Sequence, residues 1–85
     1  MKSVSRPVYR APRTPEEEKL CALFAVVLGV DHVGLDDDFF AAGGDSMMLI
    51  RVALQIRAEL GKELPIRMLF EARTVGELVQ RMQVA

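Results

Sequence analysis

Apolar residues recur at helical spacing between Leu20 and Leu28, after a helix-start signal at Thr14. Thr14-Pro15-Glu16-Glu17 supplies an N-cap hydroxyl, a proline at the first helical position and a glutamate three residues after the cap. The apolar residues that follow share one helical face: Leu20, Leu23, Phe24, Val27 and Leu28. This pattern predicts a first helix that starts at Thr14 and ends near Gly29.

A second apolar period predicts a helix from about Ser46 to Leu60, ended by Gly61. The residues at core spacing are Leu49, Val52, Ala53, Ile56 and Leu60. A second apolar stripe lies on roughly the opposite side of this helix and consists of Met47, Ile50, Leu54 and Ala58. Two interpretations are open: the stripe packs against a neighbouring helix, or it is a docking face.

Two further helical segments follow. Pro65 precedes a short one, residues 66–71, and Thr74 caps the last helix with Glu77 as its capping-box partner. The inner face of the last helix carries Val75, Leu78, Val79 and Met82. The elements together predict an all-α fold, a small bundle of four helices of which the third is short.

Residues 29–45 lack a helical period and form a long connection, a length that usually signals function or disorder. Disorder is not expected, because apolar side chains could pin the connection to the bundle: Val30, Val33, Leu35, Phe39 and Phe40. A short turn capped by Asp36 or Asp37 is expected within it. A pinned connection would deliver Ser46 to a defined place.

The first 13 residues contain Pro7, Pro12 and no apolar periodicity, which indicates an extended, mobile linker. We therefore expect a flexible linker over 1–13 and a domain over 14–85. Deleting the linker is expected to leave thermal stability nearly unchanged.

Composition narrows the class of protein. A chain of 85 residues is one domain with a small core, and its single cysteine, Cys21, excludes an internal disulfide. Cys21 is expected to be a small buried hydrophobic residue. The basic residues of the linker leave the remainder with 7 basic and 12 acidic residues, which argues against a nucleic-acid surface. No apolar run has membrane-spanning length or resembles a signal peptide, so a cytoplasmic location is expected. The chain is also expected to be a monomer.

The candidate chemistry lies where the long connection meets the second helix. Residues 37–47 read Asp-Asp-Phe-Phe-Ala-Ala-Gly-Gly-Asp-Ser-Met. Gly43 and Gly44 carry no side chain that would obstruct approach, so another protein's active site could close over Ser46. The run closely resembles the core of the peptidyl carrier (thiolation) domains of nonribosomal peptide synthetases, Asp-x-Phe-Phe-x-x-Gly-Gly-(His or Asp)-Ser.

The resemblance covers roughly residues 9 to 83. It includes Ala11-Pro12-Arg13-Thr14, Leu28-Gly29-Val30, Leu64-Pro65 and Leu69-Phe70-Glu71. The chain departs from the family at Ala42, where Leu or Ile is usual, and at Met47, where Leu is usual. Arg73 stands where Pro is common before the last helix and is expected to soften that turn.

The resemblance implies that Ser46 takes a 4′-phosphopantetheine arm from coenzyme A, in a reaction catalysed by a phosphopantetheinyl transferase that uses magnesium. The thiol of the arm would then hold an aminoacyl or peptidyl group as a thioester. The implied partners are adenylation, condensation, epimerisation and thioesterase domains. Asp45 caps the helix or helps a partner recognise the loop, and in the family an Asp here is associated with epimerisation. We expect the chain to be a segment of a larger synthetase.

Other interpretations of the same residues remain open. Ser46 could merely cap the second helix. Gly44-x-Ser46 is similar to a hydrolase nucleophile elbow, but the second glycine is missing and the only histidine, His32, lies in a separate loop. The sequence therefore predicts a non-catalytic carrier. Asp36, Asp37 and Asp38 lack the spaced ligands of a calcium loop, so no metal is expected.

The surface that meets partners is expected beside the serine, on the start of the second helix and the short helix after Pro65. Its residues are Met47, Ile50, Arg51, Leu54, Arg67 and Met68. Two rival functions stay open. One is an acyl carrier for fatty-acid or polyketide synthesis, which usually shows Asp-Ser-Leu at the serine; the other is an unmodified helical adaptor.

Overall fold

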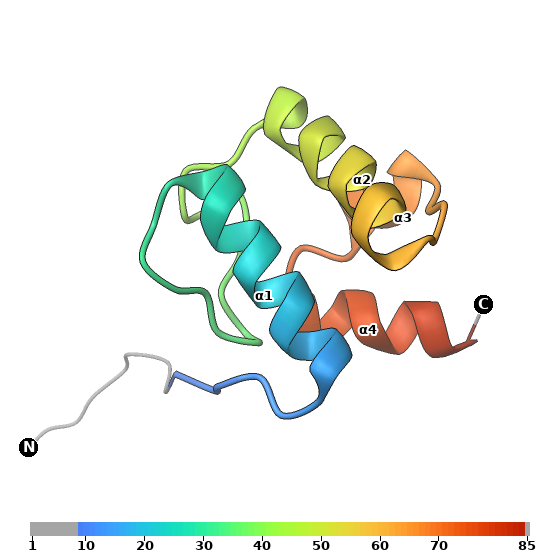
Figure 1. Cartoon of the computed structure of the whole chain (residues 1–85). Coiled ribbons are helices and arrows are strands. Elements are labelled where there is room, and N and C mark those ends of the chain that lie inside the picture. The colour runs from blue at the N-terminus through green and yellow to red at the C-terminus, as the bar shows by residue number, and fades with distance from the viewer. Residues whose placement is uncertain (1–8, 85) are drawn as a thin grey trace, which may run out of the picture.

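The computed structural model describes residues 9–84 and contains four helices (Figure 1). They are α1 (Pro15–Leu28), α2 (Ser46–Leu60), α3 (Ile66–Glu71) and α4 (Val75–Val84). The structure has no β-strand within the described residues. The predicted all-helical bundle with a short third helix is therefore confirmed, and the helix ends lie where the capping signals put them.

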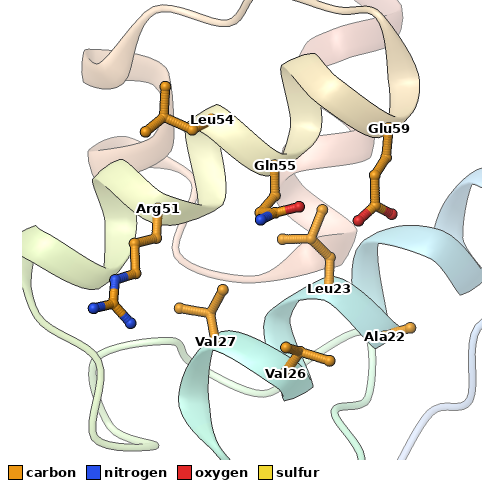
Figure 2. A pocket seen from close by; sticks show the side chains of 8 residues that line it. All are labelled: Ala22, Leu23, Val26, Val27, Arg51, Leu54, Gln55 and Glu59. Carbon is orange, nitrogen blue, oxygen red and sulfur yellow. The ribbon is translucent and has the colours of Figure 1, made fainter.

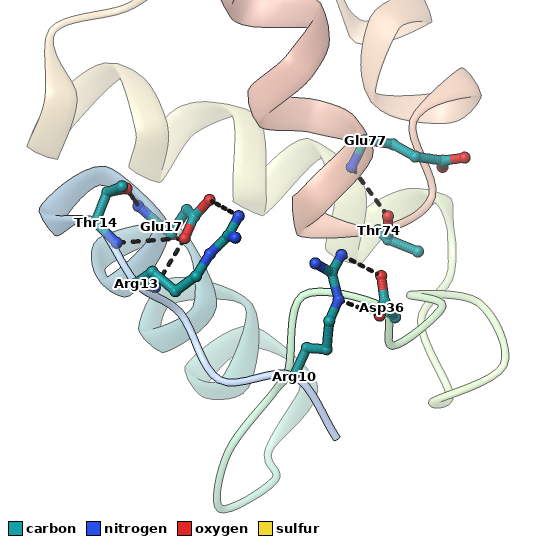
Figure 3. Close-up of polar contacts among 7 residues, drawn as sticks. All are labelled: Arg10, Arg13, Thr14, Glu17, Asp36, Thr74 and Glu77. Carbon is teal, nitrogen blue, oxygen red and sulfur yellow. Dashed lines mark hydrogen bonds and ion pairs between the residues drawn. The ribbon is translucent and has the colours of Figure 1, made fainter. Parts of the chain in front are cut away.

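The start of α1 is held by a capping box (Figure 3). The Glu17 backbone N–H donates to the Thr14 hydroxyl at 3.1 Å, and the Glu17 carboxylate accepts from the Thr14 N–H at 3.3 Å. The same carboxylate accepts from the Arg13 N–H at 2.8 Å, although the Glu17 side chain is nearly buried. This Arg13 hydrogen bond is the main reason why the pKa of Glu17 lies below its ordinary value.

Four helices and the long connection contribute to one core. In the bundle α1 packs on α2 and α4, and α3 packs on the same two helices. The largest fully buried side chains are Leu20, Phe24, Leu35, Phe39, Leu49, Val52, Ile56, Leu69, Val75 and Leu78. Burying such side chains is the main favourable contribution to the stability of a small domain.

The connection of residues 29–45 is pinned as expected, with one exception. Val33, Leu35 and Phe39 are buried, and Phe40 packs partly buried against the core. Val30 was expected to be an anchor, and this is wrong because its side chain is 42% exposed. Gly29 has a φ of 73° and ends α1 in the left-handed conformation, so the chain leaves the helix there. The N–H groups of Gly29 and Val30 still donate to the Ala25 carbonyl, but the Val30 side chain does not enter the core.

Residues 9–13 are not free of the bundle (Figure 3). The Arg10 guanidinium donates to both carboxylate oxygens of Asp36, at 2.6 and 2.8 Å, and the Arg10 carbonyl accepts from the Leu35 N–H. Tyr9 lies edge-on to His32, and its ring lies so close to Gly34 that a Cβ there would be 2.7 Å from the Tyr9 Cδ1 atom. The expectation of a mobile linker is therefore wrong for residues 9–13, and its remainder, residues 1–8, lies outside the described residues.

The start of α4 differs slightly from a capping box. The Glu77 N–H donates to the Thr74 hydroxyl at 3.1 Å, as predicted, but the Glu77 carboxylate accepts from the N–H of Arg73 and not from that of Thr74. The inner face of α4 is confirmed, with Val75, Leu78 and Val79 buried and Met82 partly buried. None of the helices within residues 9–84 has the length and apolar character needed to cross a bilayer.

Candidate functional site

Ser46 is the first residue of α2 and its side chain is exposed. The helix is capped by the preceding residue, because the Met48 N–H donates to the Asp45 carboxylate at 2.9 Å. The interpretation of Ser46 as the cap is therefore wrong, and the capping role expected of Asp45 is confirmed. Among residues 9–84, no side chain or backbone group forms a hydrogen bond with the Ser46 hydroxyl.

The two glycines before the serine serve different purposes. Gly43 has a φ of 103°, a left-handed value that strains any residue with a Cβ, and it faces open space. Gly44 lies directly against the Phe39 ring, where a Cβ would overlap the ring atoms, and its N–H donates to the Phe39 carbonyl at 2.9 Å. The approach to Ser46 is thus free of side chains on its glycine side, while the loop itself is fixed to a buried residue.

The electrostatic setting of Ser46 suits an attached anion. The N-terminal end of a helix carries partial positive charge, and the first turn of α2 contains no acidic residue. The carboxylate of Asp45 is at the cap, where it already accepts the Met48 N–H. A phosphate ester on the Ser46 hydroxyl would lie at the favourable end of the helix.

The second apolar stripe of α2 is exposed. Met47 is 71%, Leu54 59% and Ile50 45% exposed, so these three side chains do not pack against another helix of the bundle. Arg51 and Arg67 are also exposed, and Met68 is half-buried against the core. The packing interpretation of the stripe is wrong, and the docking interpretation stays a prediction.

A shallow groove of about 520 Å³ runs between α1 and α2 beside this stripe (Figure 2). Its lining includes Leu23, Val26 and Val27 from α1 and Arg51, Leu54 and Gln55 from α2. Sequence reasoning missed Val26, which is 81% exposed, and also the exposed Ile66 and Phe70 of α3. The position of Val26 off the buried face of α1 was the available signal.

Arg73 does not act as expected. Its guanidinium forms a bidentate pair with Asp38 and lies 4.8 Å from the centroid of the Phe40 ring. The substitution of the family's usual proline therefore ties the turn before α4 to the loop before Ser46, and the expectation that it softens this turn is wrong. The Arg73 hydrogen bonds are the main cause that lowers the pKa of Asp38.

The remaining candidates for chemistry lie outside the site. Cys21 is buried, and burial raises the pKa of its thiol to about 11, so this thiol is a core group as expected. His32 is exposed and lies against Tyr9. Asp37 accepts from the Gly34 N–H at 2.8 Å and caps a turn, as expected. No cluster of three or more potential metal-ligating side chains occurs in the described part of the chain.

Comparison with known proteins assigns this architecture to one family. The family model described as "Phosphopantetheine attachment site" matches residues 18–82. A dimodular nonribosomal peptide synthase of Bacillus subtilis (strain 168) is 50% identical over 76 residues, which are 89% of this chain and 3% of that protein. The chain thus spans a small part of the curated relatives it matches.

Two solved structures match most of this chain. A nonribosomal PCP domain is 44% identical with a TM-score of 0.75, over 84% of this chain and 91% of that one. The peptidyl carrier protein in complex with the phosphopantetheine transferase Sfp and coenzyme A is 36% identical with a TM-score of 0.83, over 91% of this chain and 100% of that one. The chain belongs to the phosphopantetheine attachment family, among its peptidyl carrier protein domains.

Proposed function

We propose that the chain is a peptidyl carrier whose Ser46 bears the 4′-phosphopantetheine arm. The observation that carries this proposal is the exposed, unbonded hydroxyl at the first residue of α2, one residue after the glycine pair Gly43-Gly44. In the transfer, the Ser46 oxygen attacks the phosphorus next to the pantetheine of coenzyme A, and a new P–O bond forms. The diphosphate bond breaks, adenosine 3′,5′-bisphosphate leaves, and the hydroxyl proton passes to a base of the transferase.

The chain's own residues position the hydroxyl and the resulting phosphodiester. Gly43 leaves room for a foreign active site, and Gly44 lets the loop lie against the Phe39 ring. The N-terminal end of α2 favours the negative charge by about 0.3–1 kcal/mol. Within the described residues, no side chain that could act as a base forms a hydrogen bond with the Ser46 hydroxyl. This supports activation of the hydroxyl by the transferase and a non-catalytic role for this domain. When bound, the arm supplies a thiol that holds an aminoacyl or peptidyl group as a thioester.

The carrier would act as one domain of a longer synthetase. Tethering keeps the intermediate at high effective concentration near successive active sites, so the carrier contributes reach and recognition. Its partners would be the transferase and the adenylation and condensation domains, with an epimerisation or thioesterase domain downstream. The same proposal includes a monomeric state and a cytoplasmic location.

The partner surface would be the exposed stripe of α2 together with the start of α3. Met47, Ile50 and Leu54 offer adaptable apolar contacts beside the serine, while Arg51 and Arg67 add polar steering. Met68 would support this surface from a half-buried position. The groove beside Leu54 continues the same face toward α1 (Figure 2).

The function is tested by loading the arm-bearing protein. We expect an adenylation domain, supplied with ATP and its amino acid, to add one aminoacyl group that neutral hydroxylamine releases, and we expect none on Ser46→Ala. Loading by malonyl transfer in place of aminoacylation would identify an acyl carrier. Failure of a broad-specificity transferase to modify the wild-type chain would identify an adaptor and refute the carrier function.

A further inference from the structure

Arg73 holds the loop before Ser46 through its side chain and its backbone. Its Nε and Nη2 atoms donate to the two carboxylate oxygens of Asp38 at 2.8 and 3.2 Å. Its carbonyl accepts the N–H of Phe39 at 2.8 Å. Arg73 thus binds two successive residues of the connection, Asp38 and Phe39, although it lies 35 positions after Asp38 in the sequence.

The carboxylate of Asp38 connects the Arg73 side chain to the loop backbone. Its Oδ1 atom also accepts the N–H groups of Phe40 and Ala41, at 2.9 and 3.0 Å. Four donors therefore converge on one carboxylate, and the Arg73 guanidinium lies over the Phe40 ring. Bidentate arginine–carboxylate pairs with an aromatic contact fix geometry more tightly than a single-point ion pair does.

The fixed segment leads directly to the serine. The Phe39 carbonyl accepts the Gly44 N–H at 2.9 Å, and the Phe39 ring lies against Gly44. Asp45 and Ser46 follow without an intervening residue, so the position of the serine depends on where Phe39 is held. Phe40 also stacks on Phe70 of α3, with ring centroids 6.3 Å apart, which ties the loop to the short helix.

The geometry points to Arg73 as a positioning residue that keeps residues 38–45 in the arrangement from which Ser46 meets the transferase. This inference rests on the proposed function of Ser46. Removing the Arg73–Asp38 pair should lower the fraction of carrier molecules whose loop is ordered. If the transferase binds only the ordered loop, its apparent affinity for the carrier falls in proportion to that fraction. The Michaelis constant for the carrier should therefore rise, while the turnover number stays unchanged.

The experiment compares Arg73→Ala and Arg73→Lys with wild type. Arg81→Ala is the matched control, because Arg81 forms a similarly exposed pair with Glu71 but does not contact the loop. The first readout is amide hydrogen exchange, which does not depend on any transferase. We expect Arg73→Ala to speed exchange of the Phe40, Ala41 and Gly44 amides by about fivefold, with Arg73→Lys intermediate and the amides of α1 and α2 unchanged.

The second readout is transfer of the arm from coenzyme A. We expect Arg73→Ala to raise the Michaelis constant about threefold at unchanged turnover, and Arg81→Ala to behave as wild type. A raised Michaelis constant with unchanged loop exchange would mean that Arg73 touches the transferase directly, and it would overturn the inference. Unchanged exchange and unchanged kinetics would overturn it as well. If the transferase does not modify the wild-type chain, the proposed function fails. The exchange measurement still tests whether Arg73 orders residues 38–45.

Discussion

The ring of Phe39 occupies the space that a side chain at Gly44 would need. Phe39 is 1% exposed and also packs edge-on against Phe24 of α1, with ring centroids 5.5 Å apart, so it cannot move aside freely. The loop before the serine is thereby seated on the core of the domain. The close contact explains why the second residue of the glycine pair must be small although its backbone is not left-handed.

Gly44→Ala should destabilise the domain because the added methyl group overlaps the Phe39 ring. We expect a loss of about 1–3 kcal/mol in the free energy of unfolding, measured by urea denaturation. Phe39→Leu in the same chain should relieve the overlap, so the double variant should lose less stability than the two single variants together. Additive losses would show that the methyl group is accommodated without the ring.

Removal of residues 1–13 should lower thermal stability, contrary to what the absence of apolar periodicity suggests. The truncation deletes the Arg10–Asp36 pair, the carbonyl that accepts the Leu35 N–H, and the Arg13 N–H that satisfies Glu17. We expect the unfolding midpoint to fall by more than about 5 °C. Arg10→Ala in the full chain should cause only part of this fall. An unchanged midpoint after truncation would return the domain boundary to Thr14.

Stability should decline in acid because Glu17, Asp36 and Asp38 have pKa values below their ordinary ones in the folded state. A carboxyl group with a lowered folded pKa contributes stability above its unfolded pKa and loses it as the pH falls through the folded value. We therefore expect the midpoint urea concentration to fall between about pH 5 and pH 2. Glu17→Gln should flatten this slope; a slope unchanged by the substitution would mean that Glu17 is not a source of it.

Met47→Asp should separate partner binding from folding. Met47 is largely exposed, so we expect the variant to retain helical circular dichroism and cooperative unfolding. Transfer to or from a partner domain should slow about tenfold, equivalent to ~1.4 kcal/mol. Gln83→Asp adds the same charge at an exposed position of α4, which does not pack on α2, and should transfer at the wild-type rate. Equal rates for Met47→Asp and wild type would place the docking face elsewhere.

The parts of this structure that sequence reasoning predicted are those with local signals. Thr14 with Glu17 and Gly61 after Leu60 mark helix ends through contacts only a few residues apart, and these ends are confirmed. The apolar character of the connection identified Phe39 as an anchor. The same argument was wrong at Val30, where a left-handed cap redirects the chain.

The parts that escaped prediction depend on pairs of charged residues distant in sequence. The Arg10–Asp36 and Arg73–Asp38 pairs join residues 26 and 35 positions apart, and composition carries no information on such pairing. Arg73 was expected to soften the turn because proline is common at its position. In the structure it instead fixes that turn through its pair with the Asp38 carboxylate in another loop. Ser46 itself was found because its motif is contiguous.

Attachment of the arm to Ser46 is the central claim, and mapping the modified peptide tests it most directly. After incubation with coenzyme A, magnesium and a broad-specificity transferase, the account predicts the mass of one phosphopantetheine on the tryptic peptide of residues 20–51, which contains Ser46. Ser5→Ala should be modified like wild type, and Ser46→Ala should remain unmodified. An arm on Ser46→Ala, or no arm on the wild-type chain, would contradict the account.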